Sequence, residues 1–270
     1  MKIHLSFLMV VILLGCNEKQ KKTNNVVPAE KPTPAISYQY VASYPHDVTS
    51  FTEGFLFYNG KLFESTGATT ELPQTRSLFG IVNLTTGKID TKVEIDKVKY
   101  FGEGITILNG KIYQLTYRSK VGFVYDATTY KKLSEFTLPS DEGWGLTTDG
   151  TNLIMSDGTY ELIYLDPATL QAIKRVPVTE KGTGIVNINE LEYINGYIFA
   201  NIWTTNTIIK INPSDGTVIG KLDLSSLSDD AKSINPGSLE MNGIAFNATT
   251  GRVFITGKMW PKIYELQLGN

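Results

Sequence analysis

An internal repeat constrains the fold more than any other feature of this sequence. The segments Phe-Thr-Glu-Gly-Phe at residues 51–55 and Asn-Gly-Lys-Leu-Phe at 59–63 reappear as Phe-Gly-Glu-Gly-Ile at 101–105 and Asn-Gly-Lys-Ile-Tyr at 109–113, an offset of 50 residues. Weaker copies occupy residues 143–150, 189–196 and 241–251. Each copy joins two short runs by an Asn-Gly, Asp-Gly or Thr-Gly pair, which is typical of a β-hairpin. Five hairpins spaced by 41 to 53 residues predict five repeated structural units.

Further strands follow each predicted hairpin. Third strands are expected at residues 80–84, 123–126, 163–166, 208–212 and 263–266, and fourth strands at, for example, 91–95 and 134–138. Four strands per unit are typical of propeller blades. The fifth unit ends at Leu268 after three strands, whereas residues 38–44 form an unpaired run before the first unit. We therefore predict an all-β, five-bladed β-propeller whose last blade is completed by the N-terminal strand, which removes an exposed edge. A jelly roll or an eight-stranded barrel is the alternative, and neither accounts for five copies of one motif.

The N-terminus carries the pattern of a lipoprotein signal. Lys2 precedes an apolar run at residues 5–14, which is too short to span a bilayer and leads into Leu-Leu-Gly-Cys at 13–16. This ending resembles the bacterial lipobox, which implies a signal peptide at 1–15 and lipidation of Cys16; an ordinary secretory signal with an incidental Cys is the alternative. Residues 16–37 are predicted as the lipidated Cys and a flexible tether, and 38–270 as the propeller domain. We expect the protein in the bacterial cell envelope, facing the periplasm or the surface, with its lipid anchor as the membrane contact.

Composition excludes several classes of function. The 25 Lys and Arg residues against 27 Asp and Glu residues give a formal charge of −2, so no nucleic-acid partner is expected. One Cys and two His exclude a disulfide framework and a site built from several Cys or His ligands. Removal of the signal peptide would leave His46 as the single histidine. We expect one folded domain and a monomer.

The repeat also identifies candidate site residues, because function in a propeller lies at the mouth of its central channel. The equivalent position at the start of each inner strand carries, in order, Glu53, Glu103, Trp144, Asn189 and Asn242. These side chains are expected to face one another. The alternative is a polar ring that holds channel water, or a Ca²⁺ ion through carboxylate and carbonyl oxygens.

The ends of the second strands form another equivalent set, which includes Tyr117, Trp203 and Lys258. Large aromatic residues beside polar loops are suited to line a small-molecule pocket, and Lys258 would add a positive charge. Ordinary packing, and a solvated lysine, are the alternatives for each of these residues taken alone.

Several of these segments, taken in order, carry a family resemblance: residues 51–54, 101–104, 142–146, 189–193, 201–203, and 242–245 leading to 256–262. They resemble the plant and bacterial type of glutaminyl-peptide cyclotransferase, also called glutamine cyclotransferase. The resemblance implies a five-bladed propeller that converts the N-terminal Gln of a peptide or small protein to pyroglutamate and releases ammonia. It also implies that no metal is required for catalysis, unlike in the zinc-dependent animal type, and it allows a structural Ca²⁺ in the channel.

The resemblance assigns roles residue by residue. Catalytic roles fall to Glu103 as acid/base and to Lys258 and Asn189 as its partners, and substrate-binding roles fall to Phe51, Glu53, Phe101, Tyr117, Trp144 and Trp203. Two positions depart from the family pattern, since Gln is frequent at the place of Glu53 and Trp is usual at the place of Tyr117. Burial should raise the pKa of Glu103 toward the working pH, where a general acid/base is effective.

Two other functional classes fit parts of the sequence. A metal-dependent propeller lactonase or lyase would recruit its metal through channel carboxylates, although the chain offers few histidines. A noncatalytic lipoprotein that binds peptide or glycan at an aromatic mouth is the third interpretation.

Overall fold

The repeated Asn-Gly pairs form tight hairpin turns between the first two strands of a sheet. In the computed structural model, which describes residues 31–269, both residues of each pair have positive φ: 49° and 72° at Asn59 and Gly60, 51° and 73° at Asn109 and Gly110, and 49° and 89° at Asn195 and Gly196. Two consecutive left-handed residues define a type I′ turn, whose twist matches that of the strands it joins. The predicted signal peptide and Cys16 lie outside the described residues.

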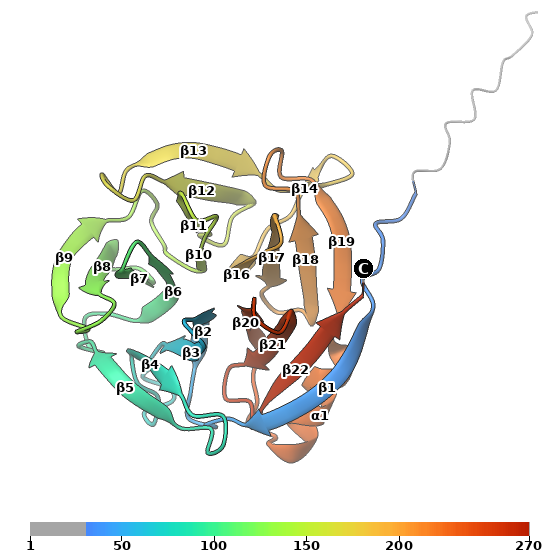
Figure 1. The fold of residues 1–270 in the computed structure, drawn as a ribbon, viewed down its shortest axis with the longest axis horizontal. Coiled ribbons are helices and arrows are strands. Elements are labelled where there is room, and N and C mark those ends of the chain that lie inside the picture. Colours follow the sequence, from blue (N-terminus) through green and yellow to red (C-terminus); the bar gives the residue numbers. More distant parts are fainter. Residues whose placement is uncertain (1–30, 270) are drawn as a thin grey trace, which may run out of the picture. The chain divides into compact units, whose positions relative to one another are not determined.

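Five four-stranded antiparallel sheets surround a common axis (Figure 1), with β2, β6, β10, β16 and β20 innermost. Blade 1 contains β2 (Thr52–Tyr58), β3 (Lys61–Thr66), β4 (Leu78–Val82) and β5 (Ile89–Glu94), and blade 2 contains β6 (Gly102–Leu108), β7 (Lys111–Thr116), β8 (Val121–Asp126) and β9 (Lys132–Thr137). Blade 3 contains β10 (Leu146–Thr148), β11 (Leu153–Met155), β12 (Glu161–Leu165) and β13 (Ala172–Pro177). Blade 4 contains β16 (Ile188–Ile194), β17 (Tyr197–Ile202), β18 (Thr207–Ile211) and β19 (Val218–Asp223). Blade 5 contains β20 (Met241–Asn247), β21 (Arg252–Gly257), β22 (Lys262–Leu268) and β1 (Tyr38–Pro45).

The N-terminal strand closes the ring, as predicted. Strand β1 pairs antiparallel with β22 from Tyr38 opposite Leu268 to Pro45 opposite Lys262, and it is the outermost strand of blade 5 (Figure 1). The predicted all-β, five-bladed propeller is therefore confirmed.

The expected tether is wrong in its last residues. The Ile36 amide donates to the Lys221 carbonyl at 2.7 Å, and the Lys221 amide donates to the Pro34 carbonyl at 2.9 Å. This stretch therefore extends along β19, because the outer strand of blade 4 still has free backbone groups to offer.

Two elements were not expected from the sequence. Helix α1 (Ser225–Ile234) connects blades 4 and 5, and a short hairpin of β14 (Thr179–Glu180) and β15 (Thr183–Gly184) connects blades 3 and 4. The helix buries Leu227 and Ala231 against Trp260 and Tyr264 of blade 5. With so few apolar positions in ten residues, it lacks the sustained period that reveals a helix in sequence. No helix in the described part of the chain has the length and apolar character needed to cross a membrane.

The core is divided among the interfaces between neighbouring blades. Five clusters of buried apolar residues each join two adjacent blades, including blades 5 and 1. Toward the axis, glycines allow the backbones of neighbouring inner strands to approach closely. A Cβ atom on Gly104 would lie 2.5 Å from the carbonyl oxygen of Trp144, and a Cβ atom on Gly145 would lie 2.1 Å from the carbonyl oxygen of Asn189, so a side chain would clash at either position. These approaches place the residues beside each glycine close to the axis.

Candidate active site

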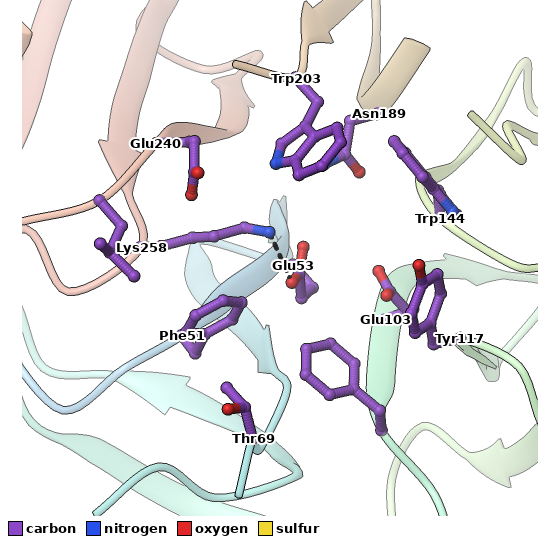
Figure 2. Close-up of a pocket in the computed structure, with 12 residues that line it drawn as sticks. Phe51, Glu53, Thr69, Glu103, Tyr117, Trp144, Asn189, Trp203, Glu240 and Lys258 are labelled. Carbon is purple, nitrogen blue, oxygen red and sulfur yellow. Dashed lines mark ion pairs between the residues drawn. The ribbon is translucent and has the colours of Figure 1, made fainter. Parts of the chain in front are cut away.

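A cavity of about 300 Å³ opens where the inner strands begin. It is lined by Phe51, Glu53, Thr69, Phe101, Glu103, Tyr117, Trp144, Asn189, Trp203, Leu239, Glu240 and Lys258, most of which are labelled in Figure 2. All nine residues that the sequence analysis assigned to catalysis or substrate binding therefore meet in one cavity. Asn242, the fifth member of the repeated position, does not line it.

Glu53 and Lys258 form a buried ion pair within the cavity wall (Figure 2). The Lys258 Nζ lies 2.8 Å from Oε1 of Glu53, and the two residues are 6% and 2% exposed. The Asn242 Nδ2 donates to the other Glu53 oxygen at 2.9 Å, so both oxygens are occupied. The Lys258 ammonium also lies 4.6 Å from the centroid of the Phe51 ring, an arrangement that stabilises a cation. A solvated position for Lys258 is therefore wrong, and its direct partner is Glu53 rather than the expected Glu103.

Two backbone hydrogen bonds hold Lys258, which lies in the loop after β21 rather than on an inner strand. Its amide donates to the Glu240 carbonyl and its carbonyl accepts from the Leu239 amide, each at 2.9 Å. The loop after β21 is thereby tied to the segment that enters β20. Although burial lowers the pKa of Lys258, the neighbouring carboxyls, chiefly its bonded partner Glu53, outweigh that effect and raise it, so the side chain stays an ammonium.

Glu103 is a buried carboxyl without a bonded partner. It is 4% exposed, and no side chain or amide in residues 31–269 donates a hydrogen bond to its carboxyl oxygens. Burial raises the pKa of Glu103 well above its usual range, and the negative charge of Glu53 raises it further, while Lys258 acts in the opposite direction. Burial also raises the pKa of Glu53, but Lys258 limits the result to about 7. The bonds from Lys258 and Asn242 therefore favour the ionised form of Glu53, whereas the burial of Glu103 without a donor favours its protonated form.

An arc of aromatic rings encloses the carboxyls. Consecutive ring centroids from Phe51 through Phe101, Tyr117 and Trp144 to Trp203 are 5.8, 5.9, 6.5 and 5.6 Å apart. Trp203 is 37% exposed and therefore lies at the mouth. The arc supplies an apolar wall that can hold a small side chain and exclude water from Glu103.

A polar atom on the cavity wall lacks a partner. Asn189 is 2% exposed, and its Oδ1 has no hydrogen-bond donor among the described residues. Buried polar atoms in proteins are nearly always bonded, so this oxygen is suited to receive an N–H group from a bound molecule.

Three lining residues were missed by the sequence analysis: Thr69, Leu239 and Glu240. Thr69 lies in the loop after β3 and the other two lie just before β20. Glu240 precedes the repeated Asn242 by two residues, as Phe51 and Phe101 precede Glu53 and Glu103. Its equivalence to Phe51 and Phe101 is the signal that could have identified Glu240.

His46 has a structural environment outside the cavity. Its Nε2 lies 3.1 Å from Oε1 of the buried Glu64, and its Nδ1 lies 2.8 Å from the Trp260 carbonyl oxygen. Burial lowers the pKa of His46, but Glu64 outweighs that effect and raises it. The pair links the segment after β1 to blades 1 and 5, so it reinforces the closure of the ring.

The carboxylates deeper along the axis accept hydrogen bonds from backbone amides. Glu190 accepts hydrogen bonds from the amides of Phe55 at 3.3 Å and Ile244 at 2.9 Å, and Glu192 accepts one from Phe246 at 2.8 Å. These bonds tie blade 4 to blades 1 and 5. Within residues 31–269 no three His, Cys, Asp or Glu side chains are grouped closely enough to hold a metal. The Ca²⁺ that the resemblance allowed would have to be held mainly by backbone and amide oxygens, and it stays a prediction.

Comparison with known proteins agrees with this architecture. The family model described as glutamine cyclotransferase matches residues 7–268. A curated glutaminyl-peptide cyclotransferase from Arabidopsis thaliana is 40% identical over 232 residues, which cover 85% of this chain and 71% of the relative. The crystal structure of glutaminyl cyclase from Myxococcus xanthus superposes with a TM-score of 0.78 at 32% identity, covering 87% of this chain and 98% of that one.

Proposed function

Because the chain belongs to the glutamine cyclotransferase family, we propose that its cavity performs the family reaction by acid/base catalysis at Glu103. The activity is that of a glutaminyl-peptide cyclotransferase: the N-terminal glutaminyl residue of a peptide is converted to pyroglutamate and ammonia is released. The mechanism rests on one observation above all. Glu103 is a buried carboxyl with a raised pKa inside the aromatic cavity, so it holds a proton that it can donate.

The reaction requires two proton transfers, and one carboxyl can perform both. The α-amine, after giving its extra proton to solvent, attacks the γ-carboxamide carbon as the neutral base, which gives a tetrahedral intermediate with a protonated ring nitrogen. Glu103 donates its proton to the departing nitrogen, which leaves as ammonia when the carbon–nitrogen bond breaks. The Glu103 carboxylate then takes the surplus proton from the ring nitrogen and returns to its starting state. Since nucleophile and electrophile belong to one residue, the protein chiefly has to select a folded conformation of that side chain.

Lys258 and Asn189 complete the catalytic group in this proposal. Lys258 has three N–H donors, of which the ion pair with Glu53 uses one, so its ammonium can also donate to the carboxamide oxygen as negative charge develops there. Asn189 presents a free oxygen that can accept an N–H group of the substrate. Phe51, Phe101, Tyr117, Trp144 and Trp203 hold the glutaminyl side chain and exclude water.

We further propose that catalysis needs no metal. The support is chemical: a protonated carboxyl and an ammonium supply the acid and the oxyanion donor, and the channel carboxylates are engaged by amides. The test is ammonia release from Gln-initiated dipeptides with and without EDTA. Turnover that resists the chelator supports the proposal. Chelator-sensitive hydrolysis of lactones would favour the lactonase or lyase interpretation, and peptide binding without turnover would favour a noncatalytic binding protein.

The proposed location is the bacterial cell envelope, with the enzyme anchored through lipid on Cys16 and acting as a monomer. The apolar run that ends in Leu-Leu-Gly-Cys supports this location. Metabolic labelling with a radioactive fatty acid should mark the wild-type protein and leave the Cys16→Ser variant unlabelled. Sedimentation of the soluble domain should give the mass of one chain.

A further inference from the structure

We propose that Glu240 is a substrate-binding residue that holds the positively charged α-amino group of the N-terminal glutaminyl substrate. This inference rests on the proposed function, because it concerns the same cavity. An α-amine has a pKa of about 7.7–8.0, so most of the substrate arrives as a cation at neutral pH. A cavity that desolvates this cation needs an anionic group whose oxygens are free to accept its N–H donors.

Three carboxyl groups line the cavity, and two of them are unsuited to this task. Both oxygens of Glu53 are occupied, one by Lys258 at 2.8 Å and the other by Asn242 at 2.9 Å. Glu103 retains its proton, because burial and the neighbouring charge of Glu53 disfavour its ionised form. A cation that enters the cavity therefore finds neither of these groups free and negatively charged.

Glu240 meets both requirements. Its side chain is half-buried, lines the cavity, and makes no hydrogen bond or ion pair with any other residue in the described range. The charge of Glu240 acts within the site, because it raises the pKa of both Glu53 and Lys258. Figure 2 shows its carboxylate at the edge of the cavity, beside Lys258 and Trp203. The bond from the Lys258 amide to the Glu240 carbonyl holds the backbone of this residue in place.

Asn189 offers a second acceptor within the same cavity. Its buried Oδ1 lacks a donor, and Figure 2 places Asn189 on the side of Trp203 away from Glu240. An ammonium group offers three N–H donors and can serve more than one acceptor at once. A carboxylate without a bonded partner and an unpartnered amide oxygen in one cavity suit a substrate that brings both an ammonium group and further N–H donors.

This arrangement distinguishes the substrate from its product. Cyclisation converts the α-amine into a lactam nitrogen, which carries no charge. The product therefore loses the attraction of Glu240 while keeping the contacts with the aromatic arc. Glu240 should strengthen the binding of substrate and leave the binding of product unaffected.

The test compares Glu240→Gln with the wild-type protein on two ligands, Gln-Ala amide as substrate and pyroglutamyl-Ala amide as product. We expect the variant to raise KM for the substrate about tenfold and to leave the inhibition constant of the product within twofold. The kcat should be unchanged or higher, because Glu240 favours the ammonium form and the attack needs the neutral amine. The kcat/KM of the wild type should fall as salt is added, and that of the variant should fall less. Glu135→Gln on β9, whose carboxylate pairs with Lys132 on the outer edge of blade 2, is the matched control and should behave as wild type.

Two results would overturn the proposal. An unchanged KM would show that Glu240 does not contact the cation, and an equal weakening of substrate and product would show that it only shapes the cavity. Glu240→Asp, which keeps the charge, should restore part of the lost affinity, and failure to do so in a folded protein also counts against the proposal. If the wild-type chain released no ammonia, the proposed function itself would fail, whereas calorimetric binding of Gln-Ala amide would still test Glu240.

Discussion

Replacement of Lys258 by Met removes the only cation bonded to Glu53 in the described part of the chain. The Glu53 carboxyl would then be 2% exposed with a single remaining donor, Asn242. Breaking a buried ion pair costs about 3–5 kcal/mol when the remaining charge is left without compensation. For a domain of this size, about 2–4 °C is lost per kcal/mol, so a fall in Tm of roughly 6 to 20 °C is expected at alkaline pH.

The size of this loss should depend on pH in a defined direction. Without Lys258, burial raises the folded-state pKa of Glu53 above its unfolded value, and the folded protein then prefers the protonated carboxyl. A carboxyl with a raised folded-state pKa loses stability as pH rises, because the unfolded chain ionises more readily. The variant should therefore be closer to wild type in Tm at pH 5 and further from it at pH 9.

The double variant Glu53→Gln with Lys258→Met separates stability from catalysis. It replaces both charges, so it should regain most of the lost Tm and lose the pH dependence of the difference. Its kcat should remain at least tenfold below that of the wild type, because the oxyanion donor is still missing. Melting curves and kcat on a Gln dipeptide for all four proteins of this cycle test the reasoning. A Lys258→Met protein with wild-type Tm at pH 9, or a double variant that is as unstable as the single variant, would refute it.

Two further predictions concern Glu53 and the closing strand. Glu53→Gln removes a negative charge that raises the pKa of Glu103. The alkaline limb of the profile of kcat against pH reports loss of the Glu103 proton, so it should move to lower pH in this variant, and a limb that stays in place or moves to higher pH would contradict the assignment. Deletion of residues 17–31 should leave Tm unchanged, whereas deletion through residue 45 should expose β22 and cause aggregation or a much lower Tm; equal tolerance of both deletions would argue against closure by β1.

The sequence predicted the fold well because the propeller repeats its local chemistry. The Asn-Gly turns, the glycines of the inner strands and the unpaired run before the first unit each have one geometric consequence, and together they define five blades. Helix α1 and the contacts of residues 34–36 with Lys221 occur once, so no internal copy revealed them.

The site was predictable where it follows the repeat and hidden where it does not. Glu53 and Glu103 occupy equivalent positions, and their meeting in one cavity follows from ring symmetry. The choice of Glu53 as the partner of Lys258 depends on the loop after β21. Glu240 occupies the position equivalent to Phe51 and Phe101, but a carboxylate there does not resemble the aromatic rings of the other two blades. Side-chain pairing of this kind is set by three-dimensional distances that residue spacing does not encode.

The most direct test of the account is the turnover of Glu103→Gln. The substitution keeps the shape of the side chain and removes the proton that the mechanism transfers. We expect kcat for ammonia release from a Gln dipeptide to fall by about 100-fold or more, with a Tm and circular dichroism spectrum close to those of the wild type. A folded Glu103→Gln protein with near-normal turnover would contradict the assignment of Glu103 as the acid/base.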